Sequence, residues 1–217
     1  MFVVNPRRFE LMSEALHTTA LKVILSASSD LAFQSVSLSE NSFTMLRGAS
    51  GSGKSTLMHA LAGLQPIAKG HIQVGNNIIT SRQVPKDWRR VSIGFIPQRP
   101  FFWPSLTVKQ NLSLSAWCKE SRELGLDWVD KLGLTPKLNQ NAHSLSLGEQ
   151  QRLSAVRAFA NHAPVLLADE PIASLDQRNA ELLLDSLKTY QAESGCAVLF
   201  ASHDPQWKSY ANQVIEL

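Results

Sequence analysis

Apolar positions along this chain form two patterns, continuous runs and helical periods, which alternate from residue 43 onward. Runs rich in apolar residues predict strands at residues 43–46, 91–96, 165–168, 196–201 and 213–217, and the run 165–168 is continuous. Such runs are typical of strands that are covered on both faces, as in parallel sheets. Residues 57–64 are expected to form an apolar helix, and amphipathic spacing predicts a helix at residues 176–192. Because strands alternate with helices, we expect a mostly parallel sheet.

Two other regions have different patterns. Residues 16–25 and 33–38 are rich in apolar and β-branched or alternating positions, and residues 70–78 alternate around a Gly-Asn-Asn turn, so we expect short antiparallel strands and a hairpin there. Residues 99–160 have helical periodicity broken by glycine and proline, which predicts an inserted helical subdomain. One domain is therefore expected, with a core of residues 1–98 and 161–217.

Composition limits the possible functions without selecting one. With 217 residues and 24.0 kDa the chain can form one medium-sized domain with a hydrophobic core. The net charge of +3 comes without a basic run, so nucleic acid is not an expected partner. No stretch approaches the roughly 18 apolar residues of a membrane span, and residues 1–10 do not have the order of a secretory signal. Cys118 and Cys196 lack metal-ligand spacing, which favours reduced core thiols in a cytoplasmic protein.

A glycine-rich stretch between a predicted strand and a predicted helix matches Gly-x-x-x-x-Gly-Lys-Ser/Thr. It comprises Gly48, Ala49, Ser50, Gly51, Ser52, Gly53, Lys54, Ser55 and Thr56. The glycines let backbone amides turn toward an anion, and a helix N-terminus favours negative charge. Lys54 would add a charge for the β- and γ-phosphates, and the Ser55 hydroxyl would be a ligand for magnesium. The sequence therefore predicts an α/β fold of the P-loop NTPase class, with a mostly parallel core sheet, an N-terminal antiparallel β subdomain and an inserted helical subdomain.

Two carboxylates, Asp169 and Glu170, directly follow the apolar run 165–168. Side chains at the end of a buried parallel strand point into the crevice where such sheets bind ligands. Asp169 would hold magnesium directly or through water, and Glu170 could accept a proton from an attacking water. A surface Asp-Glu pair is the alternative interpretation, and the phosphate loop favours the functional one.

Six motifs in a fixed order make the chain resemble the nucleotide-binding subunit of ABC transporters from about residue 33 to residue 217. They are the phosphate loop 48–56, Gln98, the signature segment 145–152, Asp169-Glu170-Pro171, Ala173-Ser174-Leu175-Asp176 and Ser202-His203-Asp204. Ala168, together with residues 148–152, is similar to the branch that includes lipoprotein-releasing and macrolide-export ATPases. Separately from the resemblance, Ser146-x-x-Glu149 predicts a capping box, which would place Ser146 at a helix N-terminus.

The resemblance implies an ATPase that uses ATP and Mg²⁺. Glu170 would be the general base, and His203 would contact the γ-phosphate. Gln98 would contact both magnesium and the attacking water, and it would link the site to the helical subdomain. Ser55 and Asp169 would be the other metal ligands.

The resemblance also implies two protein partners. The first is a second copy of the chain in an ATP-sandwich homodimer, in which the signature segment and the aspartate after it face the partner's phosphate loop; the residues concerned are Ser146, Gly148, Glu149 and Asp176. The second is an integral membrane transporter subunit, which would dock on an exposed apolar surface at residues 101–104. The protein would then be cytoplasmic and peripheral on the inner face of the plasma membrane.

The sequence departs from the family pattern at three places. Leu147 replaces the first of two glycines after the signature serine, and we expect it to crowd the closed dimer or to adopt an awkward backbone conformation. Residues 18–31 contain no aromatic side chain to stack on adenine, so we expect weak discrimination between ATP and GTP unless Phe33 takes that role. Ile172 and Ala173 replace the usual Thr-Ser, which removes polar contacts near the dimer interface.

Two alternatives to a transporter ATPase stay open. A soluble ABC ATPase of DNA repair or translation would usually carry two nucleotide domains, a coiled coil or basic insertions, and the sequence has none of these. A regulatory module with impaired hydrolysis is the other alternative, and Leu147 favours it. Phosphate release from the pure protein would distinguish this hydrolysis-impaired module from a transporter ATPase.

Overall fold

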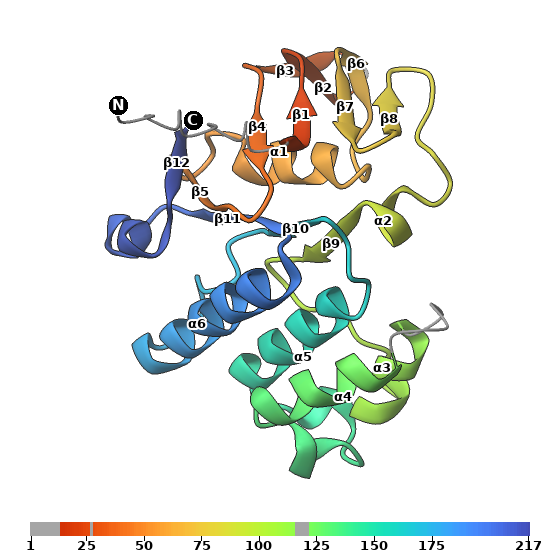
Figure 1. The fold of residues 1–217 in the computed structure, drawn as a ribbon, viewed down its shortest axis with the longest axis vertical. Coiled ribbons are helices and arrows are strands. Elements are labelled where there is room, and N and C mark those ends of the chain that lie inside the picture. The colour runs from red at the N-terminus through yellow and green to blue at the C-terminus, as the bar shows by residue number, and fades with distance from the viewer. Residues whose placement is uncertain (1–13, 27, 116–121) are drawn as a thin grey trace, which may run out of the picture.

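The computed structural model describes residues 14–26, 28–115 and 122–217 (Figure 1). The predictions for residues 1–10 and for Cys118 lie outside these ranges. At the centre is a parallel sheet in the order β12-β5-β11-β10-β9. Its strands are β5 (Phe43–Arg47), β9 (Ile93–Ile96), β10 (Val165–Ala168), β11 (Ala197–Ser202) and β12 (Gln213–Glu216).

Both faces of the inner strands β5, β10 and β11 are buried, which explains their apolar runs. The edge strand β12 has exposed ends and half-buried middle residues, so the buried strand expected at 213–217 is only partly covered. In β11, Val198 and Phe200 belong to one hydrophobic cluster, and Leu199 and Ala201 belong to another. Side chains alternate between faces along a strand, so the two clusters lie on opposite sides of the sheet. The first cluster is completed by helices from the C-terminal half, and the second by α1 (Lys54–Leu61) and the antiparallel strands.

The antiparallel strands form two smaller sheets beside α1 (Figure 1). One has the order β4-β1-β7-β8 and the other β3-β2-β6. The strands are β1 (Glu14–Thr18), β2 (Leu21–Ser26), β3 (Ser29–Phe33), β4 (Ser37–Ser39), β6 (Ile67–Lys69), β7 (His71–Val74) and β8 (Asn77–Thr80). The predicted hairpin is confirmed as β7 and β8. Short antiparallel strands are present at both ends of the range 33–38, since β3 ends at Phe33 and β4 begins at Ser37; between them the chain crosses from one sheet to the other, and Val36 bonds to Thr18.

Helix α1 begins and ends three residues earlier than the helix that was predicted at residues 57–64. It begins at Lys54 because Gly53 before it is left-handed, and it ends at Leu61 because Gly63 has a φ of 67° and its amide bonds back to Ala60. A short helix, α2 (Trp88–Val91), precedes β9. Short 3₁₀ helices occur at Thr135–Lys137, Ala142–Ser144 and Pro205–Tyr210.

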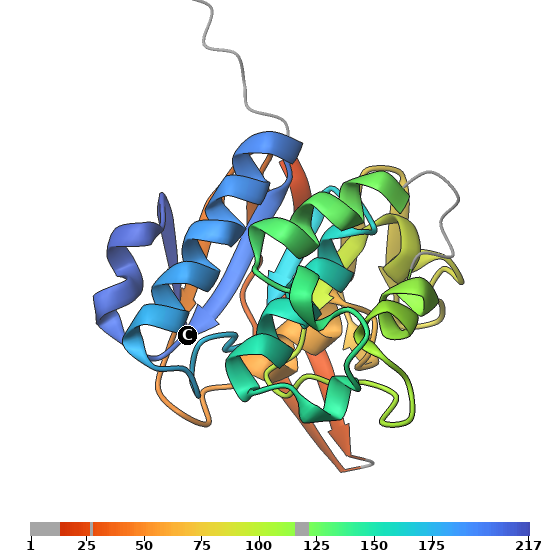
Figure 2. The same ribbon diagram turned by 90° about the horizontal axis from the view of Figure 1, so that it is seen from below.

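The segment between β9 and β10 is helical, as predicted, with α3 (Val108–Ser115), α4 (Arg122–Lys131) and α5 (Leu147–Phe159). Figure 2 looks onto this side of the molecule, where α5 contacts α4 and also α6 (Gln177–Ser194). In the described ranges no helix is both long enough and apolar enough to cross a membrane. Cys196, just before β11, is a buried free cysteine, and burial raises the pKa of its thiol.

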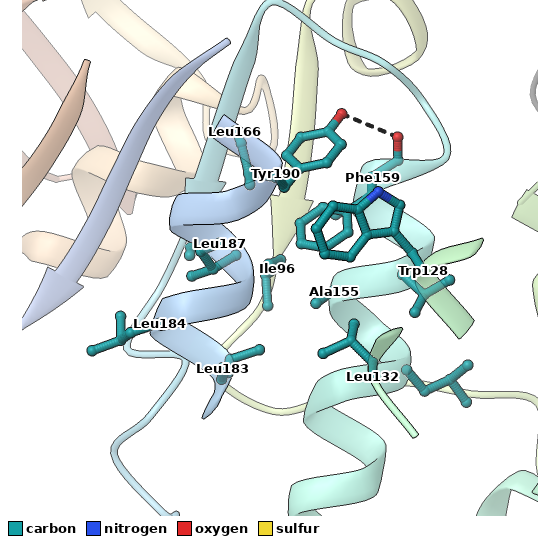
Figure 3. Close-up of a cluster of buried hydrophobic side chains, with 14 of the residues drawn as sticks. Ile96, Trp128, Leu132, Ala155, Phe159, Leu166, Leu183, Leu184, Leu187 and Tyr190 are labelled. Carbon is teal, nitrogen blue, oxygen red and sulfur yellow. Dashed lines mark hydrogen bonds between the residues drawn. The ribbon is translucent and has the colours of Figure 1, made fainter. Parts of the chain in front are cut away.

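Three aromatic rings join α4, α5 and α6 (Figure 3). Phe159 stacks on Tyr190 with a centroid distance of 4.1 Å, and Trp128 meets both rings edge-on at 4.8 and 5.6 Å. Tyr190 Oη donates a hydrogen bond of 3.1 Å to the Phe159 carbonyl, so its only polar atom is paired. This cluster fixes the helical segment against α6, which packs on the central sheet.

Candidate functional site

The glycine-rich loop joins β5 to α1 and places its residues at the carboxyl end of the parallel sheet. Gly51 and Gly53 have φ angles of 81° and 99°, in the region that favours glycine. A Cβ at Gly53 would also lie 2.5 Å from Leu31 Cδ2, so no other residue fits there without displacement. Among the described residues, Ser52 Oγ is buried and has no hydrogen-bond partner. The loop thus has the conformation and the spare polar group of an anion site.

Lys54 is the buried cation of this loop. Its Nζ donates hydrogen bonds to the carbonyls of Gly48 and Ala49 at 2.9 and 3.0 Å and pairs with Glu170 Oε1 at 3.3 Å. The residue is only 4% exposed, and a buried ammonium needs such partners to offset its desolvation. The lysine is therefore held over the loop by a carboxylate that an incoming phosphate can replace.

Asp169 lies at the end of β10, opposite the start of α1. Ser55 Oγ donates a hydrogen bond of 3.0 Å to Asp169 Oδ1, and the Asp169 amide donates to the Ile96 carbonyl. Burial raises the pKa of the Asp169 carboxyl, and the Ser55 hydrogen bond opposes this rise. A hydroxyl and a carboxylate are thereby brought together as oxygen donors.

Glu170 and His203 approach one another beside Lys54. Glu170 Oε2 lies 3.6 Å from His203 Nδ1, and the Glu170 backbone has a φ of 42°. Left-handed backbone at a non-glycine residue is costly and is concentrated at functional sites. His203 follows β11 and its side chain is 56% exposed, so the imidazole can reach a ligand in the cleft.

Gln98 follows β9 and Pro97 and faces the phosphate loop. Its carbonyl accepts a hydrogen bond from Gln151 Nε2, which also donates to the Pro171 carbonyl at 3.0 Å. Gln151 is 3% exposed, so one buried amide ties α5 to both segments that flank the cleft. Gln151 was included in the signature segment but was assigned no role from the sequence. Its position one turn after the predicted helix N-terminus was the only indication of a contact with neighbouring segments.

These residues enclose a cleft of about 250 Å³ at the carboxyl end of the sheet. It is lined by Ser50, Gly51, Gly53, Lys54, Ser55, Thr56, Gln98 and Glu170. The lining combines backbone amides, one ammonium, hydroxyls and a carboxylate. Such a set can bind phosphate groups, hold a hard cation and take a proton from water.

The signature segment forms the start of α5. Ser146 Oγ accepts a hydrogen bond from the Glu149 amide, and Glu149 Oε2 accepts one from the Ser146 amide at 2.8 Å. The predicted capping box is therefore confirmed. Leu147, the first helical residue, is 46% exposed and has no positive φ, so the expectation of an awkward backbone there is wrong. The helix conformation suits leucine, and only its exposed side chain remains to crowd a partner.

The segments around Ser146 and Asp176 form a second polar surface, apart from the cleft. Asp176 caps α6, and Asn179 connects it to the signature helix through a hydrogen bond from Arg152 of 2.7 Å. A Cβ at Gly148 would lie 3.3 Å from Asn179, so a larger residue there would require the Asn179 side chain to shift slightly. In the described part of the chain, none of these residues lines the cleft. One copy of the chain therefore has the two polar surfaces at separate places.

Residues 101–104 are only partly the apolar surface that the sequence predicted. Phe101 and Trp103 are 68% and 56% exposed, and their rings contact edge-on. Phe102 is buried, with its ring 5.5 Å from the Arg157 guanidinium carbon, so the prediction that it is exposed is wrong. Phe102 belongs to the hydrophobic cluster that also contains residues of α4 and α5, whereas its two neighbours stay exposed.

Two other departures from the family pattern have structural explanations. Phe33 is 6% exposed and packs beside Gly53, so its ring is not an open surface for a base. Ile172 is 5% exposed and belongs to the cluster beneath the sheet, where an apolar side chain contributes to packing.

Comparisons with known proteins agree with this geometry. The sequence model of the family described as "ABC transporter" matches residues 32–173. The chain belongs to this family. The putative hemin import ATP-binding protein HrtA of Staphylococcus haemolyticus (strain JCSC1435) is 35% identical over 187 residues, which cover 83% of this chain and 85% of HrtA.

Solved structures of ABC cassettes have the same fold. The dimeric structure of MJ0796, a bacterial ABC transporter cassette, aligns with a TM-score of 0.80 and 27% identity over 93% of this chain and 94% of that one. A dimeric post-hydrolysis state of MJ0796 bound to ADP and Pi aligns with a TM-score of 0.79, also at 27% identity over 93% and 94% of the two chains. The predicted fold class is confirmed, and the protein is an ATP-binding, ATP-hydrolysing subunit of an ABC transporter.

Proposed function

We propose that this ABC subunit hydrolyses ATP in a cleft built from the phosphate loop and the ends of β9, β10 and β11. The observation that carries the proposal is the convergence of Lys54, Ser55, Asp169 and Glu170 within hydrogen-bond or ion-pair distance. Residues 1–98 and 161–217 would form the nucleotide-binding core, and residues 99–160 the helical subdomain.

The loop residues 48–56 would bind the phosphates of ATP through their amides and Lys54. When the phosphates arrive, they replace Glu170 as the counter-charge of Lys54, and the carboxylate is released to take a proton from water. His203, on the other side of Glu170, would contact the γ-phosphate. Gln98, at the mouth of the cleft, would orient the water.

The donor set fits Mg²⁺. Ser55 and Asp169 offer hard oxygen atoms 3.0 Å apart, and Gln98 lines the same cleft. The described residues include no group of three or more His, Cys, Asp or Glu side chains that could hold a metal. Few protein ligands suit magnesium, which keeps waters and takes phosphate oxygens. Bound there, the ion would neutralise charge on the phosphates.

A second copy of the chain would complete the site. Ser146, Gly148, Glu149 and Asp176 lie apart from the cleft of their own chain, on a surface that begins with a helix N-terminus. Unpaired amides at this terminus suit the γ-phosphate of ATP bound to the other copy. ATP would then join two copies head to tail, as the dimeric state of MJ0796 suggests by similarity.

Replacement of Glu170 tests the chemistry. Glu170→Gln should retain ATP binding, and its rate of phosphate release should be lower by about 100-fold or more, because a general base contributes at least that factor. Glu181→Gln, on the exposed face of α6, is the matched control and should leave the rate unchanged. An unchanged rate in Glu170→Gln would contradict the role of this carboxylate. Absence of phosphate release from the unmodified protein would favour the hydrolysis-impaired alternative.

The membrane transporter subunit would dock beside Phe101. A cleft of about 640 Å³ opens there between β9 and α5, and its lining combines apolar side chains with Arg89 and Arg157. The exposed rings of Phe101 and Trp103 lie at this side of the helical segment, and exposed apolar groups in a loop indicate a partner. Docking would hold the subunit at the cytoplasmic, inner face of the plasma membrane.

The docking surface is tested by co-purification with the membrane subunit. Phe101→Ala together with Trp103→Ala should abolish co-purification and leave ATP binding intact. Leu182→Ala, which removes an exposed leucine from α6, is the control. Equal recovery of the partner with all variants would show that the membrane subunit binds elsewhere.

A further inference from the structure

The two oxygens of the Asp169 carboxylate have different neighbours on α1. Oδ1 accepts the hydrogen bond from Ser55, and Oδ2 lies 3.9 Å from His59 Nε2. Ser55 and His59 are four residues apart and therefore project from the same side of the helix. The Asp169 side chain is only 3% exposed, so protein groups rather than bulk solvent surround it; besides Ser55 and His59, the charges of Glu170 and Lys54 also act on it.

His59 in turn contacts Phe95. Their ring centroids are 5.7 Å apart, with an angle of 59° between the planes. Phe95 lies in β9, next to Leu167 of β10, and it also lines the larger cleft beside Phe101. His59 thus lies between the carboxylate and a ring in the wall of the cleft that we assign to the membrane subunit.

We propose that His59 is a positioning residue, which holds the Asp169 carboxylate in the orientation that binds the metal of the metal–nucleotide complex. This inference rests on the proposed function of the cleft. Ser55 hydrogen-bonds one oxygen and His59 lies 3.9 Å from the other, so the two residues together favour the orientation of the carboxylate toward the phosphate loop. Contact with Phe95 keeps the imidazole in place and makes Asp169 sensitive to movement of β9.

A purely structural role would have a different signature. His59 lies in the last turn of α1, where a basic side chain can stabilise the helix through its dipole. Loss of that effect would lower stability alone. Loss of a positioning contact would weaken metal binding and leave nucleotide binding without metal unchanged.

The test uses the full chain and Mn²⁺ as the probe. Mn²⁺ affinity is measured by electron paramagnetic resonance in the presence of a non-hydrolysable ATP analogue, and nucleotide affinity is measured separately in EDTA. His59→Leu should weaken Mn²⁺ binding about five-fold. This is less than the roughly 10-fold loss that is usual when a residue hydrogen-bonded to a metal ligand is removed, because the 3.9 Å contact is longer than a hydrogen bond. In turnover, the KM for Mg²⁺ should rise by a similar factor while kcat at saturating Mg²⁺ stays unchanged.

Two further variants and a control complete the design. His59→Gln retains a polar donor and should bind Mn²⁺ more tightly than His59→Leu, and Phe95→Leu should give an affinity between those of the wild type and His59→Leu. His71→Leu replaces a half-buried histidine in β7, which faces the ring of His17, and should have no effect.

The proposal is overturned if His59→Leu changes Mn²⁺ affinity less than two-fold, if His59→Gln is no better than His59→Leu, or if nucleotide affinity in EDTA falls equally. Failure of the wild type to bind either nucleotide or Mn²⁺ would contradict the proposed function instead. The two failures are therefore distinguishable.

Discussion

Phe159 is the residue whose truncation should separate the helical segment from the core most directly. The side chain is 1% exposed, stacks on Tyr190 at 4.1 Å and meets Trp128 at 4.8 Å. Truncation of a buried phenylalanine to alanine costs about 3–5 kcal/mol, and the two ring contacts place Phe159→Ala at the upper end of that range. The hydrogen bond from Tyr190 goes to the Phe159 carbonyl, so it does not add to the loss.

The measurement is urea-induced unfolding of wild type, Phe159→Ala and Phe101→Ala. We expect a loss of about 5 kcal/mol in the free energy of unfolding for Phe159→Ala, which corresponds to a decrease of about 10–20 °C in Tm. Phe101→Ala removes the same atoms from a side chain that is 68% exposed, and it should cost about 0.5 kcal/mol or less. A loss below about 1 kcal/mol for Phe159→Ala, or equal losses for both variants, would refute the view that this aromatic cluster holds the helical segment against α6.

Three other predictions concern the ATP-bound dimer, recognition of the nucleotide's base and stability in acid. Leu147→Gly should raise both the ATPase rate and the affinity of the ATP-bound dimer, because it removes an exposed side chain from the signature surface; unchanged values in phosphate-release and ultracentrifugation assays would show that Leu147 does not crowd the partner. ATP and GTP should bind with affinities within about ten-fold, because residues 18–31 offer no aromatic side chain and Phe33 is buried, so base stacking worth roughly 1–3 kcal/mol is not expected from this segment; a strong preference in calorimetry would contradict this. The hydrogen bond from the Ser146 amide lowers the pKa of Glu149 below its ordinary value of 4.5, so its contribution to stability is present above that pH and is lost as the pH falls through the lowered pKa. Glu149→Gln should therefore flatten the pH dependence of the unfolding free energy in this acid range, and parallel curves for the two proteins would exclude the effect.

Short-range sequence patterns predicted most of the strands and helices and the central residues of the site. The continuous run 165–168 became a strand covered on both faces, and the spacing from Ser146 to Glu149 became a capping box. In both cases the residues that decide the structure are close in sequence. The order of strand, loop and helix around Lys54 likewise follows from neighbouring residues.

Features that depend on distant residues were not predictable in the same way. Phe102 is buried because the helical segment packs over it, and its neighbours Phe101 and Trp103 have the same character in sequence. His59 and Asp169 are 110 residues apart in the sequence, and local sequence patterns do not predict contacts over such a separation. Only the four-residue spacing from Ser55 to His59, taken with the position of Asp169, could have indicated it.

The place of β5 in the sheet has a consequence for synthesis of the chain. Both hydrogen-bonded neighbours of β5, β11 and β12, come about 150 residues or more later in the sequence, since β5 ends at Arg47 and β11 begins at Ala197. At about 5–20 residues per second, the ribosome needs roughly 8–30 seconds to make the intervening segment. Throughout that interval the edges of β5 are without their native partners. The nascent subunit therefore lacks the native partners of an apolar strand for many seconds, and during this time the segment is a candidate site for aggregation or for capture by chaperones.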